Sequence, residues 1–243
     1  MHPALARLDH RPWQLPSARW TWRQSWRELL FAHWPIRASD LRAHVPASLR
    51  IQEFDGSAWI GVVPFRMSGV MRRPWPDLPW ISAFPELNVR VYVERDEKPG
   101  VWFLSLDATN PLAVWAARRY FRLPYHRARM SLRAVADGIR YDSSRAGAAF
   151  SAKYRATSAP YAAAPGSLEH WLTERYCLYA LGPGQTLLRN EVHHEPWPLQ
   201  RAEAEIERNT MVEWHGLRVD GPPALLHYAH RLDVVVWSAE RCG

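Results

Sequence analysis

Hydrophobic and polar residues alternate along several stretches of the chain, with the period of two that is typical of half-buried β-strands. The clearest stretch is 87–94, in which Leu and Val alternate with Asn88, Arg90 and Tyr92. Short runs of turn residues separate these stretches, which indicates hairpins and a mainly antiparallel sheet. The predicted strands cover residues 19–34, 49–54, 58–67, 87–94, 101–106, 128–135, 138–142, 149–156, 176–181, 186–193 and 228–237.

Prolines and glycines set the expected limits of these strands. Pro35 is expected to end the first strand, and Pro64 indicates a sheet edge or a bulge, because proline has no N–H to donate. Asp55-Gly56 predicts a tight hairpin turn between the second and third strands, and Lys98-Pro99-Gly100 predicts the next turn. The segment 202–207 alternates Ala and Glu and fits either a helix or a strand.

The pattern predicts few helices. A short one is expected over 38–44, capped by Ser39, and another over 167–173. The best-marked helix spans 112–121, because a proline precedes it at the first helical position. Strands with a few short helices indicate the α+β class. The segment 72–85 is rich in Pro and Trp, so we expect an irregular loop that forms a rim or lid over a pocket.

The composition favours one domain that covers residues 1–243, since no part of the chain resembles a linker. Hydrophobic residues make up 47%, including 14 Trp, which is enough for a large core. Two cysteines cannot form a disulfide framework. No signal-peptide segment is visible, and no apolar run approaches the ~18 residues that would span a bilayer. We therefore expect a cytoplasmic protein with no membrane partner.

The net charge is +7 and the pI about 9.8, which raises the question of nucleic acid or an acidic membrane surface as a partner. The arginines are spread from Arg7 to Arg241, and most are interleaved with Asp or Glu. The densest groups lie at 118–122 and 127–133. We interpret the charge as ordinary surface charge and expect no nucleic-acid partner.

Glu86, Asn88 and Arg90 occupy alternating positions of a predicted strand, so their side chains share one face. If that face points inward, Arg90 is expected to bind a carboxylate or a carbonyl and Glu86 to orient it. Buried Arg and Glu would need each other as partners, because unpaired interior charge is costly. The alternative is a structural ion pair or a polar outer face.

Tyr125, His126 and Arg127 follow a proline corner. On a strand, Tyr125 and Arg127 would face one side and His126 the other. Tyr125 could then donate a hydrogen bond to a substrate oxygen and Arg127 could hold an anion, whereas His126 would be the general acid or base if it were the inward residue. The alternative is a core Tyr beside a surface Arg. Arg119 and Trp59 are further candidates for ligand contact.

Other polar residues are expected to be structural. His193-His194-Glu195 invites a metal site, but adjacent histidines on a strand point to opposite faces and no third ligand has a recognisable spacing. Glu174-Arg175 is expected to lock a helix end to the sheet, and His33 to be a core histidine. Because the chain lacks a Gly-rich phosphate loop, a nucleophile elbow and a nucleotide fingerprint, we expect neither a metal nor another cofactor.

Seven segments together resemble a known family. They are FAHWPI (31–36), FDGSAWIGVVPFRM (54–67), PELNVRVYV (85–93), GVWFLSLDA (100–108), ARRYFRLPYHRARM (117–130), LTERYCLY (172–179) and HHEPWPL (193–199). With these segments the chain resembles the YqjF-like family of uncharacterised bacterial proteins, a branch of the acetoacetate decarboxylase-like superfamily. The resemblance implies a mainly antiparallel, barrel-like α+β fold around a central pocket, with Glu86 in the place of the decarboxylase glutamate. It also makes a homo-oligomer a candidate assembly.

One departure from that superfamily concerns the reaction. Decarboxylases carry a lysine pair after the proline, and one of these lysines forms a Schiff base. This chain has Tyr125 and His126 at those places. Its only lysines are Lys98, in a turn where we expect it to be solvated, and Lys153, in a separate strand. The resemblance therefore supports the fold and the pocket and argues against an imine mechanism.

Three functions remain open from the sequence. The first is an enzyme that uses acid–base catalysis on a small carbonyl or carboxylate compound, as a lyase or hydrolase without a Schiff base. Its acid–base groups would be Glu86, His126 and Tyr125, and Arg90 or Arg127 would hold the anion. The second is a non-catalytic protein that binds or senses a small ligand, with anions among the candidates. The third is a basic protein that associates with nucleic acid or a membrane surface.

Overall fold

The computed structural model describes residues 2–75, 83–111, 114–115, 119 and 122–242. Its strands are β1 (Trp22–Ile36), β2 (Arg50–Ile51), β3 (Ala58–Arg72), β4 (Phe84–Arg95), β5 (Lys98–Ala108), β6 (Tyr125–Arg127), β7 (Arg129–Val135), β8 (Gly138–Arg145), β9 (Ala148–Ala156), β10 (Cys177–Leu181), β11 (Leu187–His194), β12 (Gln200–Asn209), β13 (Leu225–Val236) and β14 (Glu240–Arg241). The short helices are η1 (Pro3–Leu5), α1 (Ala38–Leu41), η2 (Arg42–His44), α3 (Leu168–Thr173), η3 (Pro183–Gln185) and η4 (Glu213–His215).

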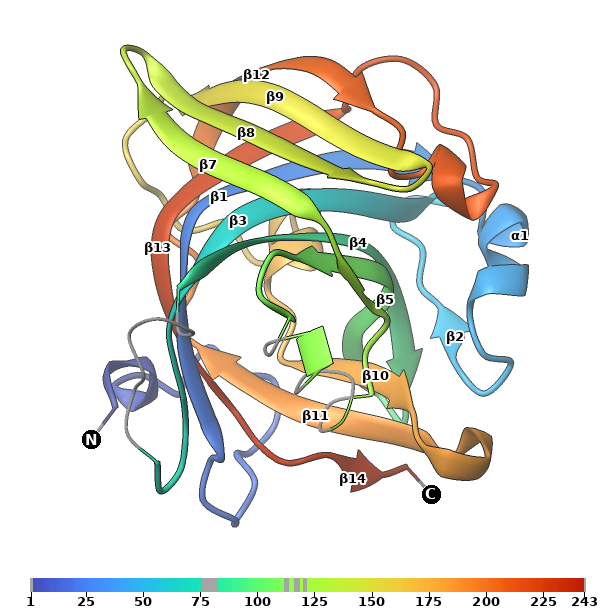
Figure 1. Cartoon of the computed structure of the whole chain (residues 1–243). Helices are drawn as coiled ribbons and strands as arrows, with labels where there is room; N and C mark the ends of the chain where they lie inside the picture. The colour runs from blue at the N-terminus through green and yellow to red at the C-terminus, as the bar shows by residue number, and fades with distance from the viewer. Residues whose placement is uncertain (1, 76–82, 112–113, 116–118, 120–121, 243) are drawn as a thin grey trace.

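The central feature is a closed barrel, seen end-on in Figure 1. Its strands follow the order β11-β10-β5-β4-β3-β1-β13, and β11 also pairs with β13, which closes the ring. Within the described residues, the pairs of β5 with β10 and with β6 are parallel, and the other strand pairs are antiparallel. The prediction of a mainly antiparallel α+β fold is therefore confirmed.

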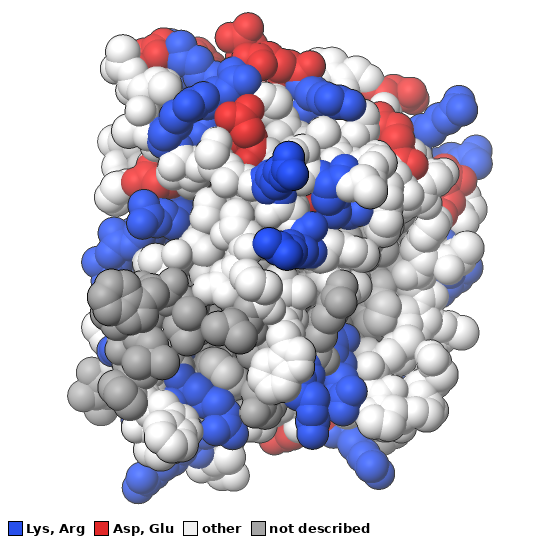
Figure 2. Space-filling model, in the orientation of Figure 1, with Lys and Arg blue, Asp and Glu red and all other residues white. Residues whose placement is uncertain are grey.

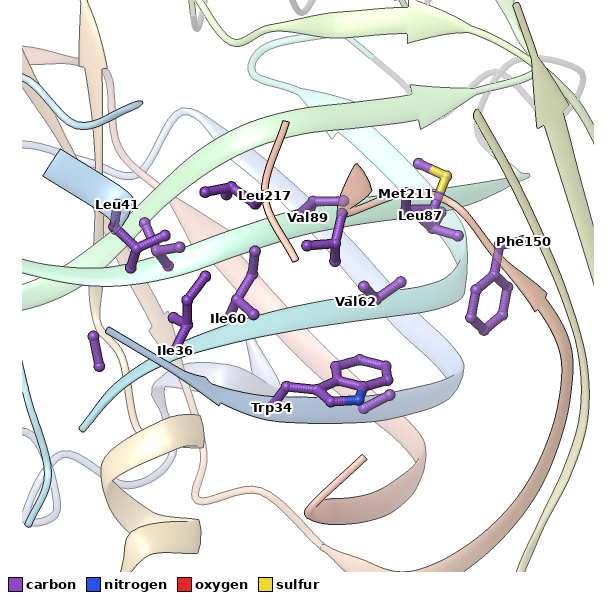
Figure 3. Packing of buried hydrophobic residues seen from close by; sticks show 14 of the residues in the cluster. Trp34, Ile36, Leu41, Ile60, Val62, Leu87, Val89, Phe150, Met211 and Leu217 are labelled. Atoms are coloured by element: carbon purple, nitrogen blue, oxygen red, sulfur yellow. The ribbon is translucent and has the colours of Figure 1, made fainter. Parts of the chain in front are cut away.

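A second layer covers one side of the barrel. The sheet continues from β13 through β12, β9 and β8 to β7, and Figure 1 shows these strands arching over β1, β3 and β4. The main hydrophobic core lies between the two layers. Figure 3 shows part of it, with Ile60, Val62, Leu87 and Val89 of the barrel in one row and Phe150 of β9 at the end of that row toward Val62 and Leu87.

The side-chain alternation of β4 divides the interior in two. Leu87, Val89 and Val91 face the second layer and belong to the main core. The intervening residues face the inside of the barrel, where a separate cluster of apolar side chains packs around them. Near one end of the barrel, Leu172 of α3 packs on Trp59, Tyr92 and Val101. The inside of the barrel is therefore a second core, and one face of β4 contributes a row of polar side chains to it.

The hairpins of the second half agree with their predictions. β7, β8 and β9 form successive antiparallel pairs, and β10 pairs with β11 across the glycine-rich turn. The ambiguous segment 202–207 lies in a strand, β12. Ser167 caps α3, because its side chain accepts a hydrogen bond from the His170 amide.

Several predictions in the first half were wrong. β2 pairs with β4 and not with β3, although Asp55-Gly56 does make a tight turn closed by a bridge from Phe54 to Ser57. Pro35 lies inside β1, opposite Trp59. The turn after β4 is at Asp96-Glu97, both with positive φ, so Lys98 already belongs to β5.

Local geometry explains two further differences. Pro64 lies in β3 between two partner strands, at a break in the β1–β3 register, so the bulge alternative holds and the edge alternative does not. The residue before α1 is Arg37, and no side chain caps that helix, so the cap predicted at Ser39 is wrong. Much of the predicted 112–121 helix and of the 72–85 loop lies outside the described residues.

On the face shown in Figure 2 the positive charge is dispersed, and the described helices are short. Figure 2 shows Lys and Arg scattered over one face, without a single continuous basic patch. Within the described residues, no helix is both long and apolar enough to cross a membrane.

We predict that Gly100→Ala destabilises the barrel where β5 meets β10. A Cβ at this position would lie 2.7 Å from Cys177 Sγ and 2.8 Å from the Cys177 carbonyl oxygen. Such overpacking typically costs about 1–3 kcal/mol of unfolding free energy, measurable by urea unfolding. Adding Cys177→Ala should restore only part of the loss, because the carbonyl remains. An unchanged unfolding midpoint in Gly100→Ala would contradict the close β5–β10 packing.

Candidate functional site

A cavity of about 80 Å³ lies inside the barrel. Six of the seven barrel strands, all but β11, contribute residues to its wall, and β6 contributes Tyr125. Most of its polar residues, Glu86, Asn88 and Arg90, lie on β4, with Gln24 of β1 beside them, and large apolar side chains such as Trp26 and Phe65 form much of the rest. Since one water needs roughly 10–15 Å³ of such space, the cavity has room for a small organic molecule.

Glu86 and Tyr125 form a hydrogen-bonded pair at this cavity. The Tyr125 hydroxyl donates to Glu86 Oε2 at 2.9 Å, and both residues are buried. The sheet register aligns Tyr125 with Leu106 of β5 and Asn88 of β4, so Glu86, two residues before Asn88 on the same face of β4, is a diagonal neighbour of Tyr125. Tyr141 of the second layer donates to the Glu86 carbonyl oxygen at 2.7 Å, which fixes the backbone from the other side.

Burial changes the protonation of both members of the pair. It raises the pKa of Glu86 to about 8; the Tyr125 hydrogen bond opposes this rise, and the charge of Asp107 adds to it. Burial, with the nearby Glu86, also raises the pKa of Tyr125 well above its ordinary value. At neutral pH the pair is therefore mostly uncharged, and both side chains can donate a hydrogen bond.

Arg90 is the charged group of the cavity. Its guanidinium carbon lies 5.0 Å from the centre of the Phe31 ring, and the residue is 9% exposed. No carboxylate of the described residues forms an ion pair with it. The Arg90 Nε and Asn88 Oδ1 atoms are buried without hydrogen-bond partners. This end of the cavity therefore presents a cation and unused polar atoms.

The predicted ion pair between Glu86 and Arg90 is wrong. These residues share the inner face, but four positions along a strand span about 13 Å, with Asn88 between them. The rise of 3.3 Å per residue separates their head groups although the alternation puts them in one chamber. The two polar groups consequently occupy different parts of the wall.

The other candidates from the proline corner lie elsewhere. His126 faces away from the cavity, and its ring contacts Trp214 at 5.2 Å between centroids. Arg127 is exposed and borders an open groove beside Arg129 and Arg145. Because β6 is a strand, turning Tyr125 inward necessarily turns His126 to the opposite face. The condition for His126 to act as the acid or base, that it points inward, is not met.

Two further candidates do not border the cavity. Arg119 is exposed. Trp59 is buried inside the barrel but packs in the cluster of Tyr92 and Leu172, and its Nε1 has no hydrogen-bond partner. The apolar wall from Trp26 and Phe65 was missed in the sequence. Only the register of β1 and β3 brings those two rings together, 6.1 Å apart.

The remaining polar residues have mixed roles. His33 is fully buried with Nε2 2.6 Å from the Tyr92 hydroxyl. Arg175 holds the end of α3 through the Trp171 carbonyl oxygen at 2.6 Å, as expected, but it also lies beside Tyr92 inside the barrel. Among the described residues, no group of three His, Cys, Asp or Glu side chains could hold a metal ion.

Both lysines of the chain are in ion pairs away from the cavity. Lys98 Nζ lies 3.1 Å from Glu191 Oε1 and is partly exposed, so the expectation of a freely solvated lysine is only partly met. Lys153 Nζ lies 2.6 Å from Asp137 Oδ1. Neither residue is among the described residues that line the cavity.

Comparison with known proteins places the chain in a family. The family DUF2071, described as an uncharacterized conserved protein, matches residues 23–233. The chain belongs to the DUF2071 family. An uncharacterized protein YqjF from Bacillus subtilis (strain 168) is 45% identical over 238 residues, which cover 97% of this chain and 98% of that protein. The YqjF-like resemblance seen in the sequence is thereby confirmed.

Solved structures share the fold. An acetoacetate decarboxylase from Legionella pneumophila has a TM-score of 0.63 at 13% identity, covering 94% of this chain and 92% of that one. The enduracididine biosynthesis enzyme MppR, complexed with pyruvate, has a TM-score of 0.64 at 11% identity, covering 96% and 93%. An acetoacetate decarboxylase-like enzyme from Sphingomonas wittichii RW1 has a TM-score of 0.62 at 14% identity, covering 93% and 94%. The acetoacetate decarboxylase-like fold is confirmed.

We predict that Glu86→Gln flattens the pH dependence of stability. The folded-state pKa of Glu86, about 8, lies above its ordinary value of 4.5, so the folded protein binds the proton more tightly than the unfolded chain. The unfolding free energy should therefore fall as pH rises from about 4.5 to about 8 and then level off. Gln has nearly the volume of a protonated Glu and does not titrate.

The measurement is urea unfolding followed by Trp fluorescence at pH 5, 7 and 9. The difference between wild type and Glu86→Gln isolates this group from the buried histidines, whose lowered pKa values act in the opposite direction. A difference that is constant across this pH range would show that Glu86 is ionised when folded.

Proposed function

We propose that this protein binds a small carboxylate- or carbonyl-bearing molecule in the barrel cavity and activates it without a Schiff base. The observation that carries the proposal is the buried Glu86–Tyr125 pair on the same cavity as Arg90, which has no carboxylate partner among the described residues. A preformed pocket with few convergent polar groups and a strongly shifted carboxyl pKa is the usual form of a ligand site.

Each polar group has a distinct task in this proposal. Arg90 holds an anionic group of the ligand, because its planar fork matches a carboxylate. Glu86 is mostly protonated at neutral pH and acts as general acid toward a carbonyl oxygen. Tyr125 donates to Glu86 Oε2 and so leaves Oε1 for the ligand. The apolar wall excludes water and strengthens these interactions.

The absence of an amine nucleophile supports the non-covalent route. The chain has two lysines, and both are engaged in ion pairs away from the cavity. Structures of the same fold include MppR with pyruvate and MppR with a condensation product of pyruvate and imidazole 4-carboxaldehyde. The fold can therefore hold small oxo acids, and the polar side chains of this cavity suit binding by hydrogen bonds and charge.

We expect Arg90→Met to weaken anion binding without lowering stability. Losing a charge-assisted hydrogen bond typically weakens binding about tenfold to a hundredfold. Removing an unpaired buried charge relieves a desolvation cost, so Tm should not fall. Calorimetric titration with propionate and pyruvate, together with thermal unfolding, checks both parts. Arg127→Met is the matched control, since that arginine is exposed outside the cavity and should bind as wild type does. Equal affinities in wild type and Arg90→Met would refute the assignment of Arg90.

We expect catalysis to appear as enolisation. Glu86 gives its proton to the carbonyl oxygen, and the carboxylate so formed takes a proton from the adjacent methyl carbon, which yields the enol and restores protonated Glu86. Wild type should therefore exchange the methyl protons of pyruvate with solvent deuterium faster than buffer, as measured by proton NMR. Glu86→Gln should lower that rate by about 100-fold or more while pyruvate still binds. Tyr125→Phe should lower it less, because Glu86 remains.

The alternative function is non-catalytic binding, which the predominantly apolar cavity wall favours. Binding of pyruvate with no exchange above the buffer rate, in wild type as in Glu86→Gln, would select this alternative. No binding of any oxo acid or carboxylate to wild type would refute both forms of the proposal.

A further inference from the structure

A second buried arginine lies close to the cation of the cavity. Arg175 is 7% exposed, and its guanidinium carbon lies 5.1 Å from the centre of the Tyr92 ring. The guanidinium carbon of Arg90 lies 6.0 Å from the centre of the same ring. Tyr92 is almost fully buried inside the barrel. Two guanidinium groups therefore share one enclosed region.

The surrounding groups leave this region positive. Arg175 is held by Gln52 Oε1, by the Trp171 carbonyl oxygen at 2.6 Å and by the Trp171 ring at 4.4 Å, all of them neutral. The nearest acid in that network, Glu94, accepts from Gln52 at 2.6 Å and pairs with exposed Arg50 at 2.6 Å. Among the described residues, neither buried arginine has an acidic partner within 4 Å.

Neighbouring titratable groups do not supply a compensating negative charge. His33 is neutral at physiological pH, because burial and then Arg90 hold its pKa well below the ordinary value. Burial lowers the pKa of Arg175 to about 10, which still leaves it charged at neutral pH. Glu86 is mostly protonated. Two like charges in a low-dielectric interior repel each other and lack solvation, so an anion with two charges gains from both.

Unused hydrogen-bonding atoms accompany these charges. Arg90 Nε and Arg175 Nη2 are buried without partners, and so is Trp59 Nε1, which packs in the Tyr92 cluster. Buried donors are normally satisfied, and of these three residues Arg90 lines the cavity, so an acceptor on a ligand there would satisfy Arg90 Nε. Gly61 lies between His33 and Arg90 in the strand pairing, and its lack of a side chain leaves room for the His33 ring.

We propose that Arg175 determines specificity by adding a second positive charge behind Arg90, and that the preferred ligand is a short dicarboxylate. This inference rests on the proposed function, because it assumes that Arg90 holds the first carboxylate. The planar guanidinium and the apolar walls suit a carboxylate on a short carbon skeleton, and the cavity of about 80 Å³ accommodates a molecule of that size. Arg175 does not border the cavity, so it acts through the electric field and not by direct contact.

The test compares acids that differ by one charge. Calorimetric titration measures malonate against propionate and succinate against butyrate at low salt, with wild type, Arg175→Gln, Arg175→Lys and Arg50→Gln. Wild type should bind each dicarboxylate about tenfold or more tightly than its monocarboxylate partner. Arg175→Gln should lose this ratio and still bind the monocarboxylates. Arg175→Lys should keep most of the ratio, and Arg50→Gln, a surface charge removed nearby, should keep all of it.

The outcomes separate the two proposals. Equal binding of mono- and dicarboxylates to wild type overturns the dicarboxylate inference and leaves the proposed function intact. The same holds if Arg175→Gln, shown by circular dichroism to be folded, weakens both kinds of acid equally, because a purely structural role would do that. If Arg175→Gln does not fold, Arg175→Met takes its place as the uncharged variant: loss of the ratio in Arg175→Met supports the inference, and a ratio equal to that of wild type overturns it. If wild type binds none of these acids and no oxo acid, the proposed function fails as well.

Discussion

Barrel closure by the β11–β13 pair is the constraint on which the site depends. In an open sheet, the inner face of β4 would meet water, and a polar row there would be ordinary. Closure encloses that row together with apolar residues from the neighbouring strands. Glu86, Asn88 and Arg90 must then satisfy their charges and hydrogen bonds inside the chamber. The unusual protonation and the unpaired atoms of the site both follow from this enclosure.

The two ends of the polar row respond to burial in different ways. A carboxyl group can lose its charge by keeping its proton, and Glu86 does so with Tyr125 as its neighbour. A guanidinium in a protein stays charged, so Arg90 remains a buried cation over an aromatic ring. The chamber consequently combines neutral donors at one place with positive charge at another. Such separation of roles along one strand suits a ligand that has an anionic group and a polar oxygen.

The fold sets the position of the chamber but not its chemistry. Structures with the same fold share only 10–14% of their residues with this chain, and identity that low leaves the side chains of the site free to differ. Here the corner after Pro124 carries Tyr125 toward the chamber and His126 away from it. The second layer contributes through Tyr141, which holds the Glu86 backbone. In this chain the chamber therefore presents hydrogen-bond donors and the guanidinium group of Arg90.

The sequence by itself determined the strands, the antiparallel class and the shared face of Glu86, Asn88 and Arg90, because these follow from local alternation. The choice between Tyr125 and His126 could not be made locally, since alternation only says that they point in opposite directions. Tertiary structure decided it, through the parallel pairing of β6 with β5. Tertiary structure also paired β2 with β4 and brought Arg175 beside Tyr92. Contacts between residues distant in sequence depend on register and closure, and no local pattern encodes either.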